Sequence, residues 1–227
     1  MKNQTITPIA YIRTDFSEKF GIPRQSGRVQ SLTAEIVFTP EFRDPEALRG
    51  IEGFSHLWLI FGFSKARKKQ FTPTVRPPRL GGNTKIGVFA SRSPFRPNGL
   101  GLSSVKLLEV KKTETDKTVL VVSGADLLDG TPIYDVKPYL PFTDCHIDAV
   151  GGYAEQFVDY KLDVVVENGA LDNFPKDKKQ ALIDCLKEDP RPSYQDDGRI
   201  YGMKLAGFDV KFKVNGKVLT VTESNKI

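Results

Sequence analysis

The stretch Leu102–Ser123, LSSVKLLEVKKTETDKTVLVVS, shows the pattern that decides the fold class. Both of its ends, Leu102–Val110 and Thr118–Ser123, are rich in β-branched and apolar residues, which is typical of β-strands. Four similar segments precede it, at Ile6–Ile12, Ala34–Phe38, His56–Phe63 and Gly87–Ala90. Glycine and proline separate these short segments, and helical patterns are few. The first two-thirds of the chain therefore predicts a β-barrel or a β-sandwich.

The pattern changes after about residue 148. Tyr153–Val166 alternates like a strand, and the apolar residues of Pro175–Lys187 fall on one face of a predicted helix. Further on, Asn215-Gly216 separates two alternating segments and tolerates the positive φ angles of a tight hairpin turn. We therefore expect two domains, one over residues 5–147 and a smaller α+β domain over residues 148–227.

Composition excludes several classes of protein. Hydrophobic residues make up 39% of the chain, which is enough for a folded core. The longest apolar run, Leu57–Phe63, is far too short to span a bilayer, and the N-terminal residues lack the pattern of a secretory signal. Cys145 and Cys185 are not in CxxC spacing, which indicates free thiols, and with only two histidines they cannot make a convincing zinc site. We expect a cytoplasmic protein with no metal centre and no membrane segment.

Basic residues are concentrated in one part of the chain. Residues 53–108 contain no Asp or Glu but ten Lys and Arg. Since the whole chain carries +5, the rest of it carries −5. A local positive field attracts phosphates and speeds association with polyanions, so this acid-free segment predicts an anionic partner. A basic face that only meets solvent is the alternative.

Two loop motifs place arginine beside proline. Pro23-Arg24-Gln25 offers a guanidinium and an amide next to a residue that fixes the backbone. Residues 87–98, GVFASRSPFRPN, hold Arg92 and Arg96 on a loop that proline stiffens, so that their guanidinium groups are ready for an anion. Plain surface turns would explain either motif without a ligand.

A third motif, residues 126–141, combines carboxylates with a turn. The turn Asp129-Gly130-Thr131-Pro132 lets the backbone approach a ligand closely, because glycine has no side chain. Asp126 and Asp135 add carboxylates that could receive a cation or a ribose. Neither a G-x-G-x-x-G fingerprint after a strand nor a P-loop occurs, which disfavours a Rossmann domain and excludes a P-loop ATPase.

Taken together, these motifs resemble the TsaA-like family, and within it the tRNA (adenine-N6)-methyltransferases. The residues that carry the resemblance are Pro23-Arg24-Gln25, Phe54–Trp58 (FSHLW), Arg76–Gly82 (RPPRLGG), Gly87–Asn98, Asp129–Pro132, Lys137–Pro141 (KPYLP) and Asp189–Tyr194 (DPRPSY). The resemblance spans nearly the whole chain. It implies a mainly β protein, a TsaA-like β-barrel that binds S-adenosylmethionine (SAM) with a small C-terminal α+β domain, and a homodimer. The implied substrate is N6 of the threonylcarbamoyladenosine at position 37, beside the anticodon of threonine tRNA.

The resemblance also implies a set of cofactor-binding residues. By motif they are Pro23, Arg24, Gln25, Ser64, Lys65, Arg92, Leu102, Asp129, Gly130, Thr131 and Pro132. This chain departs from the family pattern at two places. Ser64 stands where relatives carry histidine, and Gly99-Leu100 stands where the family commonly reads Pro-Ile.

The chemistry of the implied reaction suggests further roles. N6 of the modified adenosine must lose a proton, and we hypothesise that Asp135 or Tyr139 accepts it. The threonyl carboxylate of the substrate suits an arginine, for which Arg76, Arg79 and Arg96 are candidates. The basic run, Lys65 with Arg67, Lys68 and Lys69, would help to hold the anticodon arm of the tRNA. A tRNA- or nucleotide-binding module without catalysis, and a small-ligand barrel, are the alternatives.

Overall fold

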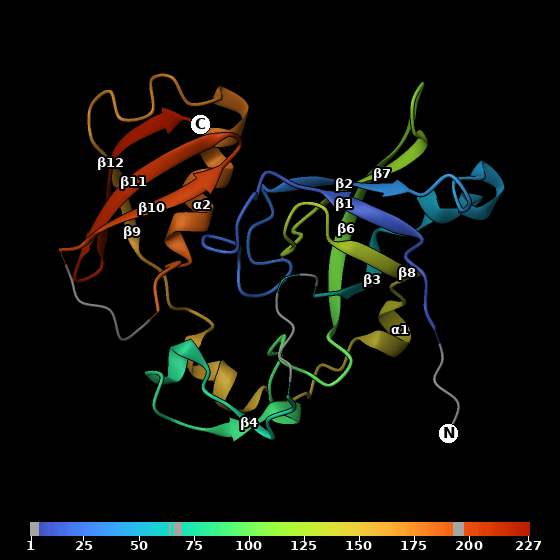
Figure 1. Cartoon of the computed structure of the whole chain (residues 1–227), viewed down its shortest axis with the longest axis horizontal. Helices are drawn as coiled ribbons and strands as arrows, with labels where there is room; N and C mark the ends of the chain where they lie inside the picture. The colour runs from blue at the N-terminus through green and yellow to red at the C-terminus, as the bar shows by residue number, and fades with distance from the viewer. Residues whose placement is uncertain (1–4, 64, 66–69, 193–197) are drawn as a thin grey trace. The chain divides into compact units, whose positions relative to one another are not determined.

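The structure is a computed structural model that describes residues 5–63, 65, 70–192 and 198–227. The chain forms two compact units (Figure 1). The first comprises Met1–Thr14, Gln25–Val75 and Ile86–Tyr139. The second comprises Leu140–Ile227 together with two segments from the first half of the chain, Asp15–Arg24 and Arg76–Lys85.

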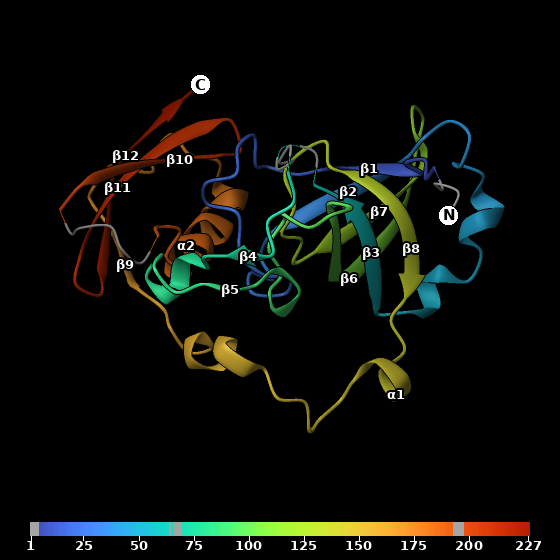
Figure 2. The ribbon, with the colours of Figure 1, turned by 60° about the horizontal axis from the view of Figure 1, so that its bottom comes forward.

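Six strands of the first unit close into an antiparallel barrel in the order β1-β2-β7-β6-β3-β8 (Figures 1 and 2). The strands are β1 (Ala10–Arg13), β2 (Thr33–Phe38), β3 (His56–Gly62), β6 (Leu100–Thr113), β7 (Lys117–Ser123) and β8 (Pro132–Pro138). The expectation of a mainly β protein is confirmed, and closure decides for the barrel over the sandwich. Short elements complete this unit: the strands β4 (Thr74–Val75) and β5 (Ile86–Gly87), and the 3₁₀ turns η1 (Pro45–Leu48), η2 (Ile51–Gly53) and η4 (Val88–Ala90).

Alternation along the strands builds the barrel core. On β3, Leu57, Leu59 and Phe61 are buried, whereas Trp58 and Ile60 between them are only half-buried. Successive side chains of a strand point to opposite faces, so one set fills the interior and the other lines the outside. Buried residues of the other barrel strands, including Ile12, Ile36 and Leu120, belong to the same core cluster.

Three predictions about the first unit need correction. Gly87–Ala90 is not a strand, since only Gly87 belongs to β5 and the rest forms η4. The first strand, predicted at Ile6–Ile12, is the shorter β1. Strand β8 was missed, because two prolines bound it and Asp135 and Lys137 interrupt its apolar pattern.

The second unit is a four-stranded sheet with one longer helix. The sheet order is β10-β11-β12-β9, and the helix α2 lies against one face of it (Figures 1 and 2). The elements are β9 (Asp163–Val166), β10 (Ile200–Leu205), β11 (Phe208–Asn215), β12 (Val218–Lys226), α1 (Pro141–Asp144), α2 (Lys179–Lys187), η3 (Pro78–Leu80), η5 (Gly152–Phe157) and η6 (Lys176–Lys178). Leu182 and Leu186 of α2 are completely buried, as are Val210 and Phe212 of β11. In the described part of the chain, we find no helix with the length and apolarity that a membrane crossing requires.

The hairpin signal is confirmed, with its turn one residue later than predicted. Asn215 pairs with Val218, so the loop consists of Gly216 and Lys217. Gly216 has φ +57°, a conformation that glycine adopts without steric cost. The predicted strand Tyr153–Val166 is wrong over its first part, where η5 stands, and right only for β9.

Candidate active site

The directions of the barrel strands bring several predicted residues to one end of the barrel. All neighbouring strands are antiparallel, so β1, β3 and β7 finish at the end where β2, β6 and β8 start. The connections at this end contain Gln25, Lys65, Arg92 and the turn Asp129–Pro132. Loops that meet at one end of a rigid barrel are well placed to form a single binding site.

A direct hydrogen bond joins two of these loops. Arg92 Nη1 donates to Gln25 Oε1 at 2.7 Å, although the two residues are 67 positions apart. The Arg92 loop is held by its own side chains, since Ser91 Oγ donates to the Val88 carbonyl and the Phe95 amide donates to Ser93 Oγ. Gln25 and Arg92, each expected to bind the cofactor, therefore lie in contact, and the loop that carries Arg92 has internal support.

A half-buried carboxyl group, that of Asp126, lies close to this pair. Ser103 Oγ donates to Asp126 Oδ1 at 2.6 Å. Burial raises the pKa of Asp126, while the hydrogen bond from Ser103 and the nearby charge of Arg92 favour its ionised form. Sequence reasoning noted Asp126 as one of three carboxylates but did not place it among the site residues. Its only signal was its position in the loop that carries Asp129.

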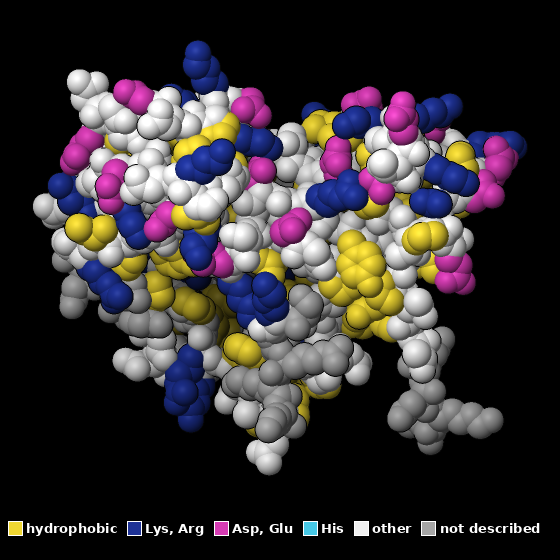
Figure 3. All heavy atoms as spheres, turned by 45° about the horizontal axis from the view of Figure 1, so that its top comes forward, with side chains coloured by type: hydrophobic (Ala, Val, Ile, Leu, Met, Phe, Trp, Pro, Cys, Tyr) yellow, Lys and Arg dark blue, Asp and Glu magenta, His cyan; other side chains and the backbone are white. Residues whose placement is uncertain are grey.

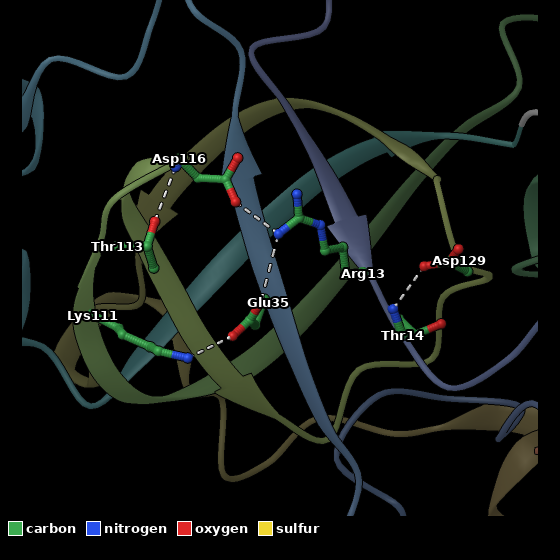
Figure 4. A network of polar contacts seen from close by, with 7 residues as sticks. All are labelled: Arg13, Thr14, Glu35, Lys111, Thr113, Asp116 and Asp129. Atoms are coloured by element: carbon green, nitrogen blue, oxygen red, sulfur yellow. Dashed lines mark hydrogen bonds and ion pairs between the residues drawn. The ribbon is translucent and has the colours of Figure 1, made fainter. Parts of the chain in front are cut away.

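The turn Asp129–Pro132 is fastened to the end of β1. The Thr14 amide donates to Asp129 Oδ1 at 2.9 Å (Figure 4). The Gly130 amide donates to the Ile12 carbonyl, and the Ile12 amide donates to the Thr131 carbonyl. Thr131 is buried and its Oγ1 donates to the Leu128 carbonyl, so its hydroxyl supports the turn. The exposed groups of this turn are Asp129 and Gly130.

Polar contacts on the adjoining strands reinforce the barrel wall. Arg13 Nη1 lies 2.8 Å from Asp116 Oδ2 and 3.8 Å from Glu35 Oε2, and Lys111 Nζ lies 3.2 Å from Glu35 Oε1 (Figure 4). These surface pairs link β1, β2 and β6 to the β6–β7 connection. Exposed ion pairs of this kind contribute little to stability, because water screens them. On the face drawn in Figure 3, Lys and Arg are interspersed with Asp and Glu in the same way.

The outer wall of the barrel places Leu102 and Asp135 at one level. Both are paired with Ile60, Leu102 from β6 and Asp135 from β8. Leu102 is 54% exposed, and Asp135 Oδ2 accepts an ion pair from Lys137 Nζ at 2.8 Å. Tyr139 lies elsewhere, past the other end of β8. Its amide donates to the His56 carbonyl and its ring lies 5.4 Å from that of Trp58.

The predicted residues Pro23, Arg24, Arg76 and Arg79 belong to the second unit. Arg24 Nη2 donates to the Arg191 carbonyl at 2.7 Å, and Arg79 Nη2 donates to the Glu188 carbonyl at 2.6 Å. Burial lowers the pKa of Arg24, and the charge of Arg79 lowers it further. Arg76 is exposed and, within the described residues, makes no hydrogen bond or ion pair.

The motif that begins at Asp189 supports Arg24 through the Arg191 carbonyl and Arg79 through Tyr160. Asp189 and Arg191 form a buried ion pair with Nε–Oδ1 at 3.0 Å, and Tyr160 Oη donates to Asp189 Oδ2 at 3.1 Å. Burial and the neighbouring charge of Asp189 raise the pKa of Tyr160. The Arg79 guanidinium lies 4.6 Å from the centre of the Tyr160 ring. Sequence reasoning used this motif only for the resemblance and missed its supporting role.

Of the remaining predicted residues, the structure describes Arg96 and Lys65. Arg96 Nη1 donates to the carbonyls of Val88 and Ser91, so this guanidinium supports its own loop. Lys65 is exposed. Ser64, Arg67, Lys68 and Lys69 lie outside the residues that the structure describes.

Comparison with known proteins gives the family. The N-terminal domain of tRNA-methyltransferase O (TrmO) matches residues 11–145, and the TrmO C-terminal domain matches residues 160–227. The chain belongs to the TrmO family. The resemblance drawn from the motifs is thereby confirmed.

Relatives across bacteria agree with this assignment. The tRNA (adenine(37)-N6)-methyltransferase of Escherichia coli is 40% identical over 215 residues, which cover 91% of each chain. The enzyme of the same name from Eikenella corrodens is 44% identical over 164 residues, covering 71% of this chain and 91% of its own. A crystal structure of TrmO from Pseudomonas aeruginosa matches with a TM-score of 0.82 at 32% identity, covering 100% of this chain and 99% of that one. The expected class, a SAM-dependent tRNA methyltransferase, is confirmed.

Proposed function

We propose that this protein methylates N6 of adenine 37 in tRNA, and that its substrate is the threonylcarbamoyladenosine of threonine tRNA. The names of the TrmO relatives support the adenine and its position. The observation that carries the proposal is the meeting of the predicted loops at one end of the barrel, with Arg92 and Gln25 in direct contact. We further propose that the enzyme acts as a homodimer in the cytoplasm.

The side chains at this end of the barrel fit SAM. The Arg92 guanidinium suits the carboxylate of the cofactor, the exposed carboxylate of Asp129 suits a hydroxyl or ammonium group, and the exposed Leu102 suits an adenine face. When bound, SAM supplies a methyl group that its sulfonium already activates. The residues of the first unit that we propose to hold it are Gln25, Ser64, Lys65, Arg92, Leu102, Asp129, Gly130, Thr131 and Pro132.

Asp135 is the better candidate for the proton acceptor. It lies on the outer wall at the level of Leu102, whereas Tyr139 lies past the opposite end of β8. Lys137 Nζ lies 2.8 Å from Asp135 Oδ2 and holds this carboxyl group on the outer wall. A carboxylate is a suitable acceptor for the N6 proton. In this proposal Asp135 would accept the N6 proton, and bound SAM would supply the methyl group, with its sulfur–methyl bond breaking to leave S-adenosylhomocysteine. Tyr139 is therefore not the residue that we propose as the proton acceptor.

The tRNA contacts follow from the distribution of positive charge. Three arginines are candidates for binding the threonyl carboxylate. The guanidinium of Arg76 makes no hydrogen bond or ion pair with the described residues, whereas those of Arg79 and Arg96 donate to backbone carbonyls. Lys65, Arg67, Lys68 and Lys69 would contact phosphates of the anticodon arm. The acid-free segment thus serves RNA in this proposal, rather than solvent.

Nucleoside analysis tests the proposed function. The protein is incubated with SAM and with tRNA from cells that lack the corresponding gene, and the digested nucleosides are separated by mass. We expect threonylcarbamoyladenosine to gain one methyl group in threonine tRNA. Asp135→Asn should bind SAM and tRNA normally but transfer the methyl group far more slowly, since it keeps the shape of the side chain and loses its basicity. Binding of both ligands without any transfer by the wild type would instead support a non-catalytic module.

A further inference from the structure

Two aromatic rings of the first unit are exposed side by side. Phe71 is 57% exposed and Phe89 is 70% exposed. Their ring centroids lie 6.4 Å apart at an interplanar angle of 27°, so the rings are roughly stacked. The Arg96 guanidinium lies 5.6 Å from the centre of the Phe89 ring. Covering two neighbouring exposed aromatic rings with another molecule is favourable, because it removes apolar surface from water.

The backbone holds this pair in a defined position. β4 and β5 pair Thr74 with Gly87 and Val75 with Ile86, which joins the chain just after Phe71 to the chain just before Phe89. Val88, next to Phe89, is 1% exposed, and its amide donates to the Pro73 carbonyl at 2.9 Å. A surface that is ordered before binding loses little conformational entropy when a ligand covers it.

Arg96 contributes to the same arrangement. Its Nη1 donates to the Ser91 carbonyl at 2.6 Å and to the Val88 carbonyl at 3.2 Å. These bonds hold the guanidinium beside Phe89. An arginine and an aromatic ring together form the surface on which unstacked RNA bases are commonly received.

Charge indicates the kind of molecule that covers the pair. Phe71, Phe89 and Arg96 all lie within residues 53–108, which contain ten basic and no acidic residues. The core of a protein–protein interface is usually depleted in charged residues, whereas single-stranded nucleic acid is held by aromatic rings within a positive field. The same β3–β6 connection also carries Arg92, a residue of the proposed cofactor site.

We propose that Phe71 and Phe89, with Arg96, form a stacking platform for an unpaired base of the tRNA substrate. The inference rests on the proposed tRNA substrate and adds the means by which a loop base is held. Bases of an anticodon loop can be unstacked and splayed out, which duplex bases cannot. Stacking is tolerant of sequence because every base has an aromatic face, so the platform holds the loop while other groups select the modified adenosine.

The affinity for RNA of variants that each lack one of the two rings tests the platform. Phe89→Ala and Phe71→Ala are compared with Phe89→Trp, which keeps an aromatic face. Phe142→Ala is the matched control, since Phe142 is 87% exposed and lies on α1 of the second unit. The probes are RNA hairpins with the anticodon-arm sequence of threonine tRNA. Each hairpin carries a single 2-aminopurine, at a different position of the loop.

The expected results separate stacking from charge. Phe89→Ala should bind the hairpin about five- to hundredfold more weakly, while Phe89→Trp and Phe142→Ala bind like the wild type. The salt dependence of binding should keep its slope in Phe89→Ala, because no phosphate contact is lost. At least one 2-aminopurine should be quenched on the wild type and remain bright on Phe89→Ala, with unchanged SAM affinity and melting temperature.

Two results would overturn the inference. One is wild-type RNA affinity and quenching in both Phe71→Ala and Phe89→Ala. The other is dissociation of a dimer by Phe89→Ala with RNA affinity unchanged, which would assign the rings to an interface between copies of the chain. Nucleoside analysis of the wild type is scored separately. A protein that stacks the hairpin but transfers no methyl group would keep the platform and reject the proposed function.

Discussion

At the scale of single residues, the decisive contact is the hydrogen bond between Arg92 and Gln25, which links two loops of the proposed cofactor site. Arg92 is exposed and lies outside the barrel core, so its removal should leave the fold intact. Its role in the proposed function depends on the guanidinium alone. That makes it a suitable position for a charge-removing substitution.

Arg92→Ala should lower SAM affinity about ten- to hundredfold, because a charge-assisted contact with the cofactor carboxylate is lost. Isothermal titration with SAM measures the change. Lys112→Ala serves as the control, since Lys112 is exposed on β6 away from the site. Equal SAM affinity of Arg92→Ala and the wild type would remove Arg92 from the site.

Asp126 makes a pH-dependent prediction at the same scale. Burial raises its pKa in the folded protein, so the folded state binds the proton more tightly than the unfolded chain. Stability contributed by the neutral form is therefore present below the unfolded pKa near 4 and is lost as pH rises through the folded pKa. In Asp126→Asn, the amide oxygen can still accept the hydrogen bond from Ser103, but the side chain cannot ionise.

We expect Asp126→Asn to gain stability relative to the wild type as pH rises above about 4. Urea unfolding at a series of pH values gives the difference in the free energy of unfolding. The same substitution at the exposed Asp163 of β9 provides the control. A difference that stays constant across the series would show that the Asp126 carboxyl ionises alike in both states.

At the scale of elements, close packing between β3 and β6 supports the wall that carries Leu102. Gly101 faces Phe61 across this strand pair, and a Cβ at Gly101 would overlap the Phe61 ring. The ring is buried in the barrel core and has little room to move. The site wall therefore requires a residue without a side chain next to Leu102.

Gly101→Ala should lower the free energy of unfolding by about 1–3 kcal/mol, as overpacking of a core does. Chemical denaturation measures this value. Gly87→Ala is the matched control, because no atom lies within 4 Å of its Cβ position and its φ of −59° suits alanine. Similar stability of the two variants would mean that β3 and β6 separate at little cost.

At the scale of the whole molecule, the proposed function makes substrate choice depend on the threonylcarbamoyl group. Arg76 is exposed and makes no hydrogen bond or ion pair with the described residues. In Arg79 and Arg96, only some of the N–H groups of the guanidinium donate to backbone carbonyls, so others can bind a carboxylate. A site built for a carboxylate rejects a substrate that lacks it when the bound substrate takes the arginine out of water and leaves it unpaired.

We expect tRNA with plain adenosine at position 37 to be methylated at least about a hundredfold more slowly than modified tRNA. Single-turnover rates on the two tRNAs provide the comparison, with binding measured separately. Arg76→Ala should reduce this preference and Lys112→Ala should not. Equal rates on both tRNAs would assign the arginines to phosphates alone.

Local features of the chain were predictable because they depend on neighbouring residues. β-Branched and apolar content located β2, β3, β6 and β7 closely, and the Asn215-Gly216 signal located the β11–β12 hairpin to within one residue. Periodicity and turn chemistry act over a few residues, so a sequence displays them directly. The spaced motifs went further and were enough to indicate the family.

Tertiary structure alone decided which distant residues meet. β8 closes the barrel although its sequence hides the strand pattern, and only this closure places Asp135 level with Leu102. The contact between Arg92 and Gln25, like the partial burial of Asp126, arises from connections that converge at one end of that barrel. Such contacts depend on the summed free energy of strand pairing and core packing across the whole unit. No local pattern of residues encodes that sum, so the sequence indicated most of the strands and the hairpin, whereas the tertiary structure decided which distant residues meet.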